Sequence, residues 1–375
     1  MIIFFIAISL IYIILIGSFI IGFNKIKQVK LNQTKPVNSF SIIIPFRNEE
    51  KHLPLLLKSL SNLNYPTDLF EILLINDDSS DASEIIIEKF KNNYPNLNLT
   101  ILNNIRKSNS PKKDAIETAI MKAQYNWIIT TDADCIVSKN WLRIFNQIII
   151  KNEPKFIAAP VDFNNKSCFL HNFQKLNLNS LIGSTIGGFG IKKPFLCNGA
   201  NLCYNKTAFF DVDGFSGNNK ISSGDDIFLL EKFHQNYPKK VYFLKSNEAT
   251  IKTNSEVSWK LFFNQQLRWA SKSTSYKNTF SKIVALIVYL ENLTIPILTL
   301  LTLIAPINSK YLAIIFILKI SVDFILLSKT TLFLNNKFPF KYFLFISLLY
   351  PIFIVFVGTM SLFINYNWKG RTFKK

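Results

Sequence analysis

The chain has 375 residues, of which 49% are hydrophobic, and a formal net charge of +19 from 43 basic and 24 acidic residues. Its length and apolar content fit one large globular domain with membrane segments. Such a charge could serve nucleic-acid binding, but the sequence has no zinc-finger spacing, RNA-binding aromatic motif or basic helix, so we expect no nucleic-acid partner. The charge instead favours a protein that faces anionic lipid headgroups.

Residues 2–23 form an uninterrupted apolar stretch of about the length that crosses a bilayer. A cleaved signal peptide would have basic residues before its apolar core and a small-residue cleavage site behind it, and neither is present. Lys25, Lys27 and Lys30 follow instead, so the positive-inside rule places the next segment in the cytoplasm. We therefore expect residues 1–23 to be an N-terminal transmembrane helix.

Three apolar segments further along the chain each run into a polar loop. They are residues 41–45 before Glu49, residues 71–75 before Asp77, and a strand from Trp127 that ends at Asp132 and Asp134. Runs of this kind are typical of parallel strands buried on both faces, and helical patterns follow the first two. The alternation predicts an α/β fold with a doubly wound sheet. Ligands of such sheets bind at the carboxyl ends of the strands, where we expect these four acidic side chains to gather.

Asp132 and Asp134 are separated by one residue at the end of their strand. Two carboxylates this close repel each other unless a cation shares their charge, so the pair predicts a divalent metal. The alternative is that both are solvated side chains in a turn after an edge strand.

Seven sequence blocks resemble, in order, those of the family-2 glycosyltransferases. The blocks are residues 41–50, 76–81, 112–115, 131–135, 198–201, 223–226 and 265–269. The last block, Gln265-Gln266-Leu267-Arg268-Trp269, resembles the QxxRW motif of the membrane-associated members. The resemblance covers about residues 38 to 275. It implies an inverting enzyme of the Rossmann-like GT-A fold that takes a sugar from a nucleotide-diphosphate donor, for which we expect a UDP-sugar.

The resemblance also implies roles in binding the donor. Asp132 and Asp134 would hold Mg²⁺ or Mn²⁺ against the donor diphosphate, Asp134 more directly. Glu49 and Asp77 would reach the base and the ribose, and Pro45 would fix their loop.

Lys112 or Lys113 would face the phosphates of the donor. The alternative is that both are solvated lysines on the first turn of a helix. The loop at residues 76–79 departs from the family's Asp-Asp-Gly-Ser pattern, because Asp78 stands where the family has glycine. We expect this change to affect the shape of the loop and the nucleotide preference.

Asp226 is the candidate general base. The family's usual Glu-Asp pair is here Asp225-Asp226, and the resemblance implies that the second acid accepts the proton of the acceptor hydroxyl. The alternative is that the pair caps a helix beginning near Ile227. A cap can also orient a base, so the two interpretations do not exclude each other.

Gln265, Arg268 and Trp269 are expected on an amphipathic helix from about Trp259 to Ser273 at the membrane surface. The planar guanidinium of arginine suits pyrophosphate oxygens, and an indole offers a flat face to a sugar, so we count the three among the catalytic candidates. Without the spacing to Gln265, the arginine and tryptophan would be interpreted as membrane anchors.

The histidines and cysteines show no pattern of a metal site or a catalytic triad. We expect core or surface positions for the histidines and reduced thiols for the cysteines in a cytoplasmic domain. These residues are His52, His171, His234, Cys135, Cys168, Cys197 and Cys203.

Three apolar stretches follow the QxxRW block: residues 283–307, 311–328 and 342–364. Glu291, Asn292 and Pro296 interrupt the first, which could be a span, a kinked span or an interfacial hairpin. Three full spans would leave the basic tail, residues 369–375, outside the cell. We therefore expect a cytoplasmic tail and one stretch that does not cross. Residues 368–371 also resemble a terminal motif of related membrane synthases that returns to the cytoplasmic face.

These observations divide the chain into a transmembrane helix at residues 1–23, a cytoplasmic GT-A domain with the interfacial helix at residues 24–280, and a membrane region at residues 281–375. We expect a multi-pass protein of the cell inner (cytoplasmic) membrane. Its hydrophobic stretches are few for a polymer-secreting channel, which favours transfer to a lipid or lipid-linked acceptor. The alternatives are a short-chain polysaccharide synthase and a non-catalytic membrane protein that binds nucleotide sugars.

Overall fold

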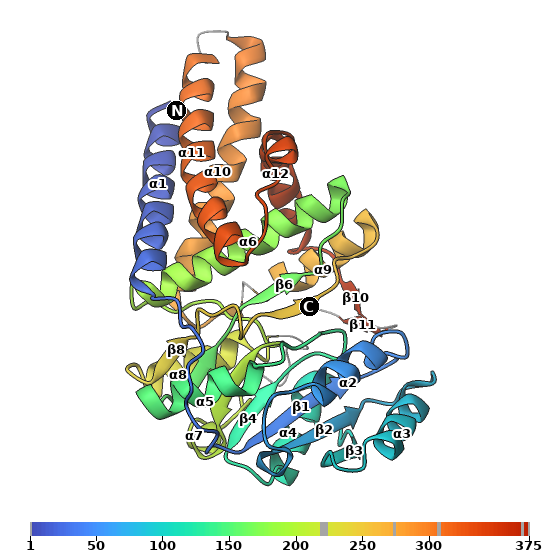
Figure 1. Ribbon diagram of the computed structural model, residues 1–375. Coiled ribbons are helices and arrows are strands. Elements are labelled where there is room, and N and C mark those ends of the chain that lie inside the picture. Colours follow the sequence, from blue (N-terminus) through green and yellow to red (C-terminus); the bar gives the residue numbers. More distant parts are fainter. Residues whose placement is uncertain (1, 218–223, 273–274, 306–308, 369–370, 374–375) are drawn as a thin grey trace. The chain divides into compact units, whose positions relative to one another are not determined.

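The computed structural model describes residues 2–217, 224–272, 275–305, 309–368 and 371–373. The chain forms two compact units, which we treat separately (Figure 1). The sheet unit comprises Lys27–Asn164 and Cys197–Asn254, and the helical unit comprises Met1–Ile26, Asn165–Leu196 and Ser255–Lys375. These two units are groups of residues that contact one another. The predicted boundaries at residues 23 and 280 instead separate membrane segments from a cytoplasmic domain, and they stay a prediction.

The centre of the sheet unit is a seven-stranded mixed sheet in the order β3-β2-β1-β4-β7-β5-β8. Its strands are β1 Phe40–Phe46, β2 Phe70–Asn76, β3 Leu99–Asn103, β4 Trp127–Thr130, β5 Phe156–Ala158, β7 Leu202–Asn205 and β8 Val241–Phe243. The three strands expected from the sequence are β1, β2 and β4, and β1 pairs in parallel with both others. β7 is antiparallel to β4 and β5, so the α/β class is confirmed but the sheet is not wholly parallel. The four residues of β7 are too few for an apolar pattern to indicate a direction.

Helices of the sheet unit pack on this sheet and fill its core. They are α2 Leu53–Ser61, α3 Ser83–Asn93, α4 Pro111–Lys122, α5 Trp141–Asn152, α7 Lys206–Asp211 and α8 Ile227–Asn236, with a 3-10 helix, η1 Thr67–Leu69, before β2. The four buried leucines of α2 recur at helical spacing and share one apolar cluster with side chains of β1 and β2. A separate parallel pair is formed by β6 Val161–Phe163 and β9 Ile251–Thr253.

The helical unit consists of six helices and a terminal hairpin among its described residues. They are α1 Ile2–Lys25, α6 Phe169–Gly190, α9 Trp259–Ala270, α10 Thr279–Ile304, α11 Ser309–Phe333, α12 Phe340–Met360, β10 Tyr366–Trp368 and β11 Arg371–Phe373. Four helices, α1, α10, α11 and α12, are long and apolar enough to cross a membrane. Large apolar side chains on them are exposed, among them Ile14, Leu303 and Phe345. Such surfaces suit lipid better than water.

α10 runs as one helix through Glu291, Asn292 and Pro296, so the interpretation of this stretch as a hairpin is wrong. Glu291 is fully buried, and the hydroxyl of Ser9 on α1 donates to its Oε2 at 2.8 Å. A neighbouring helix can therefore satisfy polar groups that would be costly in a lipid-facing position.

α6 is an element that the sequence analysis did not predict. It lies across the ends of α1, α10 and α11 within the helical unit (Figure 1). Its approach to α1 is very close, because a Cβ placed on Gly22 would lie 2.1 Å from the carbonyl oxygen of Gly187. Its sequence mixes apolar and polar residues around the whole helix, which explains why an apolar pattern did not reveal it.

The chain's last described segment packs beside α9. β10 contacts α9 and pairs antiparallel with β11, with Tyr366 opposite Phe373. Residues 369–370 of the predicted tail motif, and residues 374–375, lie outside the described residues. The tail hairpin and the Gln265–Trp269 block are thus neighbours in the helical unit.

Candidate active site

The carboxyl ends of β1, β2 and β4 lie side by side at one edge of the sheet. The register pairs Phe46 of β1 with Asn76 of β2, and Ile43 of β1 with Thr130 of β4. The loops after these strands carry the predicted acidic residues, so the topology brings their backbone positions to the same edge, as expected. Those residues are Glu49, Asp77, Asp132 and Asp134. Pro45 lies within β1, opposite Ile75.

The loop after β2 is held by two arginines and an asparagine. Arg47 Nη1 donates to the carbonyl oxygens of Asp77 and Asp78, at 2.6 and 2.7 Å. The side-chain Oδ1 of Asp77 accepts from Asn104 Nδ2 at 2.7 Å and from Arg106 Nε at 2.6 Å. Asp77 therefore has a fixed orientation at the strand end.

Asp78 takes the left-handed backbone conformation, with φ of 63°. Glycine adopts this conformation without strain, and Asp is among the residues that tolerate it best. Asp78 thus provides the backbone geometry that a glycine would give at this position. The loop can therefore keep the backbone shape that a glycine would allow, although the sequence led us to expect a change.

Glu49 has a partner that the sequence analysis did not recognise. His52 Nδ1 lies 2.7 Å from Glu49 Oε2, and the backbone N–H of Glu49 donates to Ser83 Oγ at 2.8 Å. The spacing of three residues between Glu49 and His52 was the available signal, because side chains three apart at a helix start can meet. His52 therefore lies beside a predicted donor-binding residue.

Lys112, on the first turn of α4, links two acidic groups. Its Nζ lies 2.7 Å from Asp132 Oδ1 and 3.1 Å from Asp225 Oδ2. Burial by itself would lower the pKa of the Lys112 ammonium, but the charges of Asp132 and Asp225 outweigh it and raise the pKa above its ordinary value. Lys112 is a fixed positive charge between the predicted donor carboxylate and the predicted base pair.

Lys113 has different surroundings. It is 1% exposed, and its Nζ lies 5.2 Å from the ring centroid of Phe228 on α8. The interpretation of Lys112 and Lys113 as a solvated pair is therefore wrong. A role of Lys113 toward the donor stays a prediction.

Asp226 is the N-cap residue of α8. Its Oδ1 accepts the backbone N–H of Ile227 at 2.7 Å, and its Oδ2 accepts the N–H of Gly199 at 3.3 Å. The cap interpretation is confirmed, and the capping contacts also hold the carboxylate in one orientation. Ser223, the first residue of this sequence block, lies outside the described residues.

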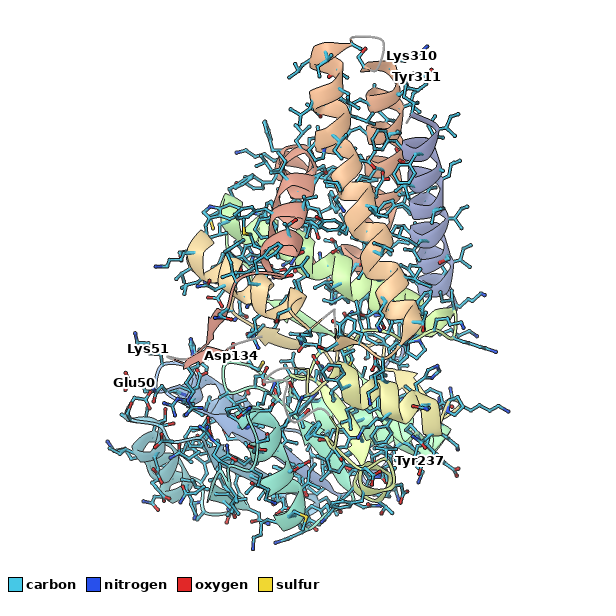
Figure 2. The ribbon with its side chains drawn as sticks, turned by 180° about the vertical axis from the view of Figure 1, so that it is seen from behind. Glu50, Lys51, Asp134, Tyr237, Lys310 and Tyr311 are labelled. Atoms are coloured by element: carbon cyan, nitrogen blue, oxygen red, sulfur yellow. The ribbon has the colours of Figure 1, made fainter. Side chains whose placement is uncertain are left out.

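Asp134, labelled in Figure 2, is braced by β9. Its Oδ2 accepts the hydroxyl of Thr253 at 3.1 Å. Just beyond it, Ile136 and Lys252 exchange backbone hydrogen bonds of 2.7 and 3.0 Å. Burial, and then the charge of Asp134, raise the pKa of the neighbouring Cys135 thiol, so this cysteine stays a neutral packing group.

The donor set of Asp132 and Asp134 fits a hard divalent cation that shares a diphosphate. Among the described residues, no group of three or more His, Cys, Asp or Glu side chains could hold a metal ion alone. Mg²⁺ at phosphate sites usually takes only one or two carboxylates from the protein and completes its shell with phosphate and water. Two carboxylates are therefore sufficient, and a cation would share Asp132 with Lys112.

Gln265, Arg268 and Trp269 lie on α9 of the helical unit, which ends at Ala270 rather than near Ser273. Their spacing of three and four residues puts the three side chains on one face of the helix. Gln265 Nε2 donates to Glu256 Oε1 at 3.3 Å. Their part in catalysis stays a prediction.

Residues 41–216 match the family described as Glycosyl transferase family 2. The probable glycosyltransferase YdaM of Bacillus subtilis (strain 168) is 24% identical over 284 residues, which are 71% of this chain and 65% of the relative. Poly-beta-1,6-N-acetyl-D-glucosamine synthase of Staphylococcus epidermidis is 27% identical over 215 residues, 56% of this chain and 49% of the relative. The chain thus spans less than two thirds of the length of either relative.

A solved structure gives a likeness over almost the whole chain. It is the mannosyltransferase PcManGT from Pyrobaculum calidifontis in complex with GDP-Man and Mn²⁺, with a TM-score of 0.60 and 14% identity, covering 96% of each chain. At this identity the likeness shows a shared fold, an α/β fold of the GT-A type.

Proposed function

We propose that this chain, whose residues 41–216 match the glycosyltransferase family 2 model, transfers a sugar from a nucleotide-diphosphate sugar to a lipid or lipid-linked acceptor with inversion at the anomeric carbon. The observation that carries the proposal is the arrangement of Asp132, Lys112 and Asp225. It joins the loop after β4 to the acid pair at the start of α8 through one lysine. The residues proposed to bind the donor diphosphate and those proposed to deprotonate the acceptor hydroxyl would therefore lie in one site.

Binding of the donor would rest on three loops. Glu49 and Asp77, held by His52 and Arg106 respectively, offer acceptors to the base and the ribose. Lys112 offers a positive charge to the phosphates. This charge is needed most when the bond to the sugar breaks, because the leaving diphosphate then gains a negative charge.

A divalent cation, Mg²⁺ or Mn²⁺, would be held by Asp132 and Asp134 and would neutralise charge on the diphosphate when bound. The hydroxyl of Thr253 orients Asp134 for this task. Such outer contacts fix the direction of a ligand and its charge distribution.

Transfer would be a single displacement. The acceptor oxygen forms a bond to the anomeric carbon while the bond from that carbon to the diphosphate oxygen breaks, and the hydroxyl proton passes to Asp226. One displacement on the face opposite the leaving group inverts the anomeric configuration. Asp225 would support the base while paired with Lys112.

For Gln265, Arg268 and Trp269 of the helical unit we keep the part in transfer that the family resemblance implies, since a guanidinium suits phosphate oxygens and an indole suits a sugar face. The tail hairpin, β10 and β11, lies beside α9, so these two segments are expected on the same side of the membrane.

A membrane location is supported by the four long apolar helices. At the start of α11, Lys310 and Tyr311 lie together, with Nζ 5.0 Å from the ring centroid (Figure 2). Such pairs are common where a helix meets the headgroups. The four helices support a multi-pass protein of the inner membrane, and Lys25, Lys27 and Lys30, at and after the end of α1, support a catalytic unit in the cytoplasm.

Two different nucleotides occur in the solved structures of similar proteins. The staphylococcal structures of TarS, a relative named as an N-acetylglucosaminyltransferase, were solved with UDP-GlcNAc and with UDP, whereas PcManGT was solved with GDP-Man. We keep a UDP-sugar as the expected donor and include guanosine donors in the test. The likeness to a poly-N-acetylglucosamine synthase supports one second candidate, a short-chain polysaccharide synthase.

The testing experiment is a screen of the purified full chain in detergent against UDP- and GDP-sugars, with a membrane lipid extract as acceptor. We expect UDP or GDP to be released with one donor, and a lipid carrying one added sugar. Products with a ladder of sugars would favour the polysaccharide synthase. Binding of UDP or GDP without release from any donor would favour the non-catalytic alternative.

A further inference from the structure

Residues 198–201, one of the blocks that resemble the family, form a turn whose last residue is hydrogen-bonded to three residues outside the turn. Asn201 is fully buried, and its Nδ2 donates to the carbonyl oxygens of Pro160 and Ala249, each at 2.7 Å. Its Oδ1 accepts from Trp141 Nε1 at 3.1 Å. All the contacts belong to the sheet unit, so the end of this turn has a fixed place next to the sheet.

The turn is closed on itself and attached to β4. The N–H of Asn201 donates to the carbonyl oxygen of Asn198 at 3.0 Å, and the N–H of Ala200 donates to Asn198 Oδ1 at 3.0 Å. The hydroxyl of Thr130, the last residue of β4, donates to the carbonyl oxygen of Gly199 at 2.9 Å. The backbone carbonyl group of Gly199 is therefore fixed to the end of strand β4.

Gly199 presents its other side to the acid pair. Its N–H donates to Asp226 Oδ2 at 3.3 Å. A Cβ placed on Gly199 would lie 2.6 Å from Asp225 Oδ2 and 3.3 Å from Lys112 Nζ, whereas real Cβ atoms essentially never approach closer than 3.0 Å. Only a residue without a side chain leaves Asp225 and Lys112 where they are.

We propose that Gly199 is a positioning residue that sets the places of Asp225 and Asp226 relative to Lys112. This inference rests on the proposed function, because it gives the acid pair a part in transfer. The turn acts through its backbone: one N–H orients Asp226, and the missing side chain leaves space for the ion pair of Asp225 with Lys112. Misplacing a reacting group by about 1 Å can cost about a hundredfold in rate.

Gly199→Ala is a suitable test, because the first atom that the new Cβ meets is the end of a flexible side chain rather than backbone. The acid should move and the fold should remain. We expect a melting temperature and a stoichiometry of UDP or GDP binding with MnCl₂ like those of the unmodified chain, and a kcat lowered by about 10- to 100-fold. Gly17→Ala is the matched control, because a Cβ there meets nothing within 4 Å.

A second variant removes the outer attachment without adding an atom near the acids. Thr130→Val deletes the hydroxyl that bonds to the carbonyl oxygen of Gly199, and Thr130→Ser restores it. We expect Thr130→Val to lower kcat by about threefold to tenfold, as loss of one buried hydrogen bond would, and Thr130→Ser to recover most of the rate.

A double-mutant cycle separates positioning from a merely structural role. If Gly199 acts through the acid pair, then Gly199→Ala should have little further effect on the residual transfer of a chain that carries both Asp225→Asn and Asp226→Asn. Unchanged kcat for Gly199→Ala, or an equal loss in both backgrounds, would overturn the inference while leaving the proposed function intact. Full transfer by Asp226→Asn alone would overturn the base assignment, and the positioning role with it.

Discussion

The ammonium nitrogen of Lys112 lies 2.7 Å from Oδ1 of Asp132. The lysine belongs to α4 and the aspartate to the loop after β4, and the same ammonium reaches Asp225 Oδ2 at 3.1 Å. The chain thus supplies its own positive charge at the point where a donor diphosphate would add negative charge. Three consequences can be measured: the affinity for a nucleotide, the dependence of stability on pH, and the response to a metal.

Replacing Lys112 with methionine keeps most of the length of the side chain and removes its charge. We expect the Kd of UDP or GDP in the presence of MnCl₂ to rise about tenfold, since a charge-assisted hydrogen bond is worth about 1.5 kcal/mol or more. Lys112→Arg, which keeps the charge, should lose less. Isothermal titration calorimetry measures both, and an unchanged Kd for Lys112→Met would contradict a role at the phosphates.

The raised pKa of Lys112 makes a second prediction. A lysine whose pKa is higher in the folded chain stabilises the fold fully below the unfolded value of about 10.4, and this contribution is lost only as pH rises through the higher folded value. The difference in melting temperature between the unmodified chain and Lys112→Met should therefore be constant from about pH 6 to pH 9. Differential scanning fluorimetry over this range checks it. A difference that changes between pH 6 and pH 9 would show that burial outweighs the ion pairs and that the pKa of Lys112 is not raised.

Metal removal tests Asp132 and Asp134. We expect EDTA to abolish turnover of the donor, and Mn²⁺ or Mg²⁺ to restore it. Asp134→Asn should raise the Kd of the nucleotide as well as lower the rate, because in the proposed site the anion would bind through a cation that this carboxylate would hold. The binding measurement should show a smaller gain from MnCl₂ in Asp134→Asn than in the unmodified chain. Full activity in excess EDTA would exclude the metal assignment.

Much of the sheet unit could be predicted from local patterns. Runs of β-branched residues marked β1, β2 and β4, and the leucine spacing marked α2, because burial on two faces or on one helical face leaves a direct trace in sequence. The acidic loops followed from the strands, since topology alone brings the carboxyl ends of neighbouring parallel strands to one edge. The placement of the loops that carry Glu49, Asp77, Asp132 and Asp134 at one edge of the sheet could be predicted for that reason.

Contacts between distant segments could not be predicted in the same way. The approach of Gly199 to Asp226, the pairing of Lys112 with Asp225 and the hydroxyl of Thr253 on Asp134 depend on how loops from different parts of the chain meet. The helix α6 left no apolar stripe, because its residues are buried around most of its circumference. Such features need the tertiary structure.

Topology is tested by two probes. Asn98 is exposed in the sheet unit, so a tag beside it should be inaccessible from outside intact cells if the catalytic unit is cytoplasmic. A reporter fused after Lys375 should also report the cytoplasm. External labelling at Asn98 would overturn the orientation, whereas external labelling of the tail alone would show that all three carboxyl-terminal helices cross.

Asp226→Asn separates catalysis from capping at a single residue. Asparagine caps helices about as well as aspartate, so the capping role predicts a stability change well under about 1 kcal/mol and a rate that is barely altered. A general base predicts a different result, because an amide cannot accept the acceptor's proton. We expect turnover to fall by about a hundredfold or more while the Kd of the nucleotide stays nearly constant.

The comparison of Asp226→Asn with Asp225→Asn makes the result specific. Asp225 is the partner of Lys112, so its amide variant should disturb nucleotide binding as well as turnover. Asp226 Oδ1 accepts the N–H of Ile227 at 2.7 Å and Oδ2 accepts the N–H of Gly199 at 3.3 Å. The single oxygen of an amide can keep the shorter capping bond to Ile227 and loses the longer bond to Gly199, so we expect the variant to fold and to bind nucleotide as before. Single-turnover transfer of a radiolabelled sugar, with melting temperature as the control for folding, distinguishes the two. Near-normal transfer by a folded Asp226→Asn chain would move the base to Asp225 or exclude this mechanism, because no other feature of Asp226 would then be tied to the chemistry.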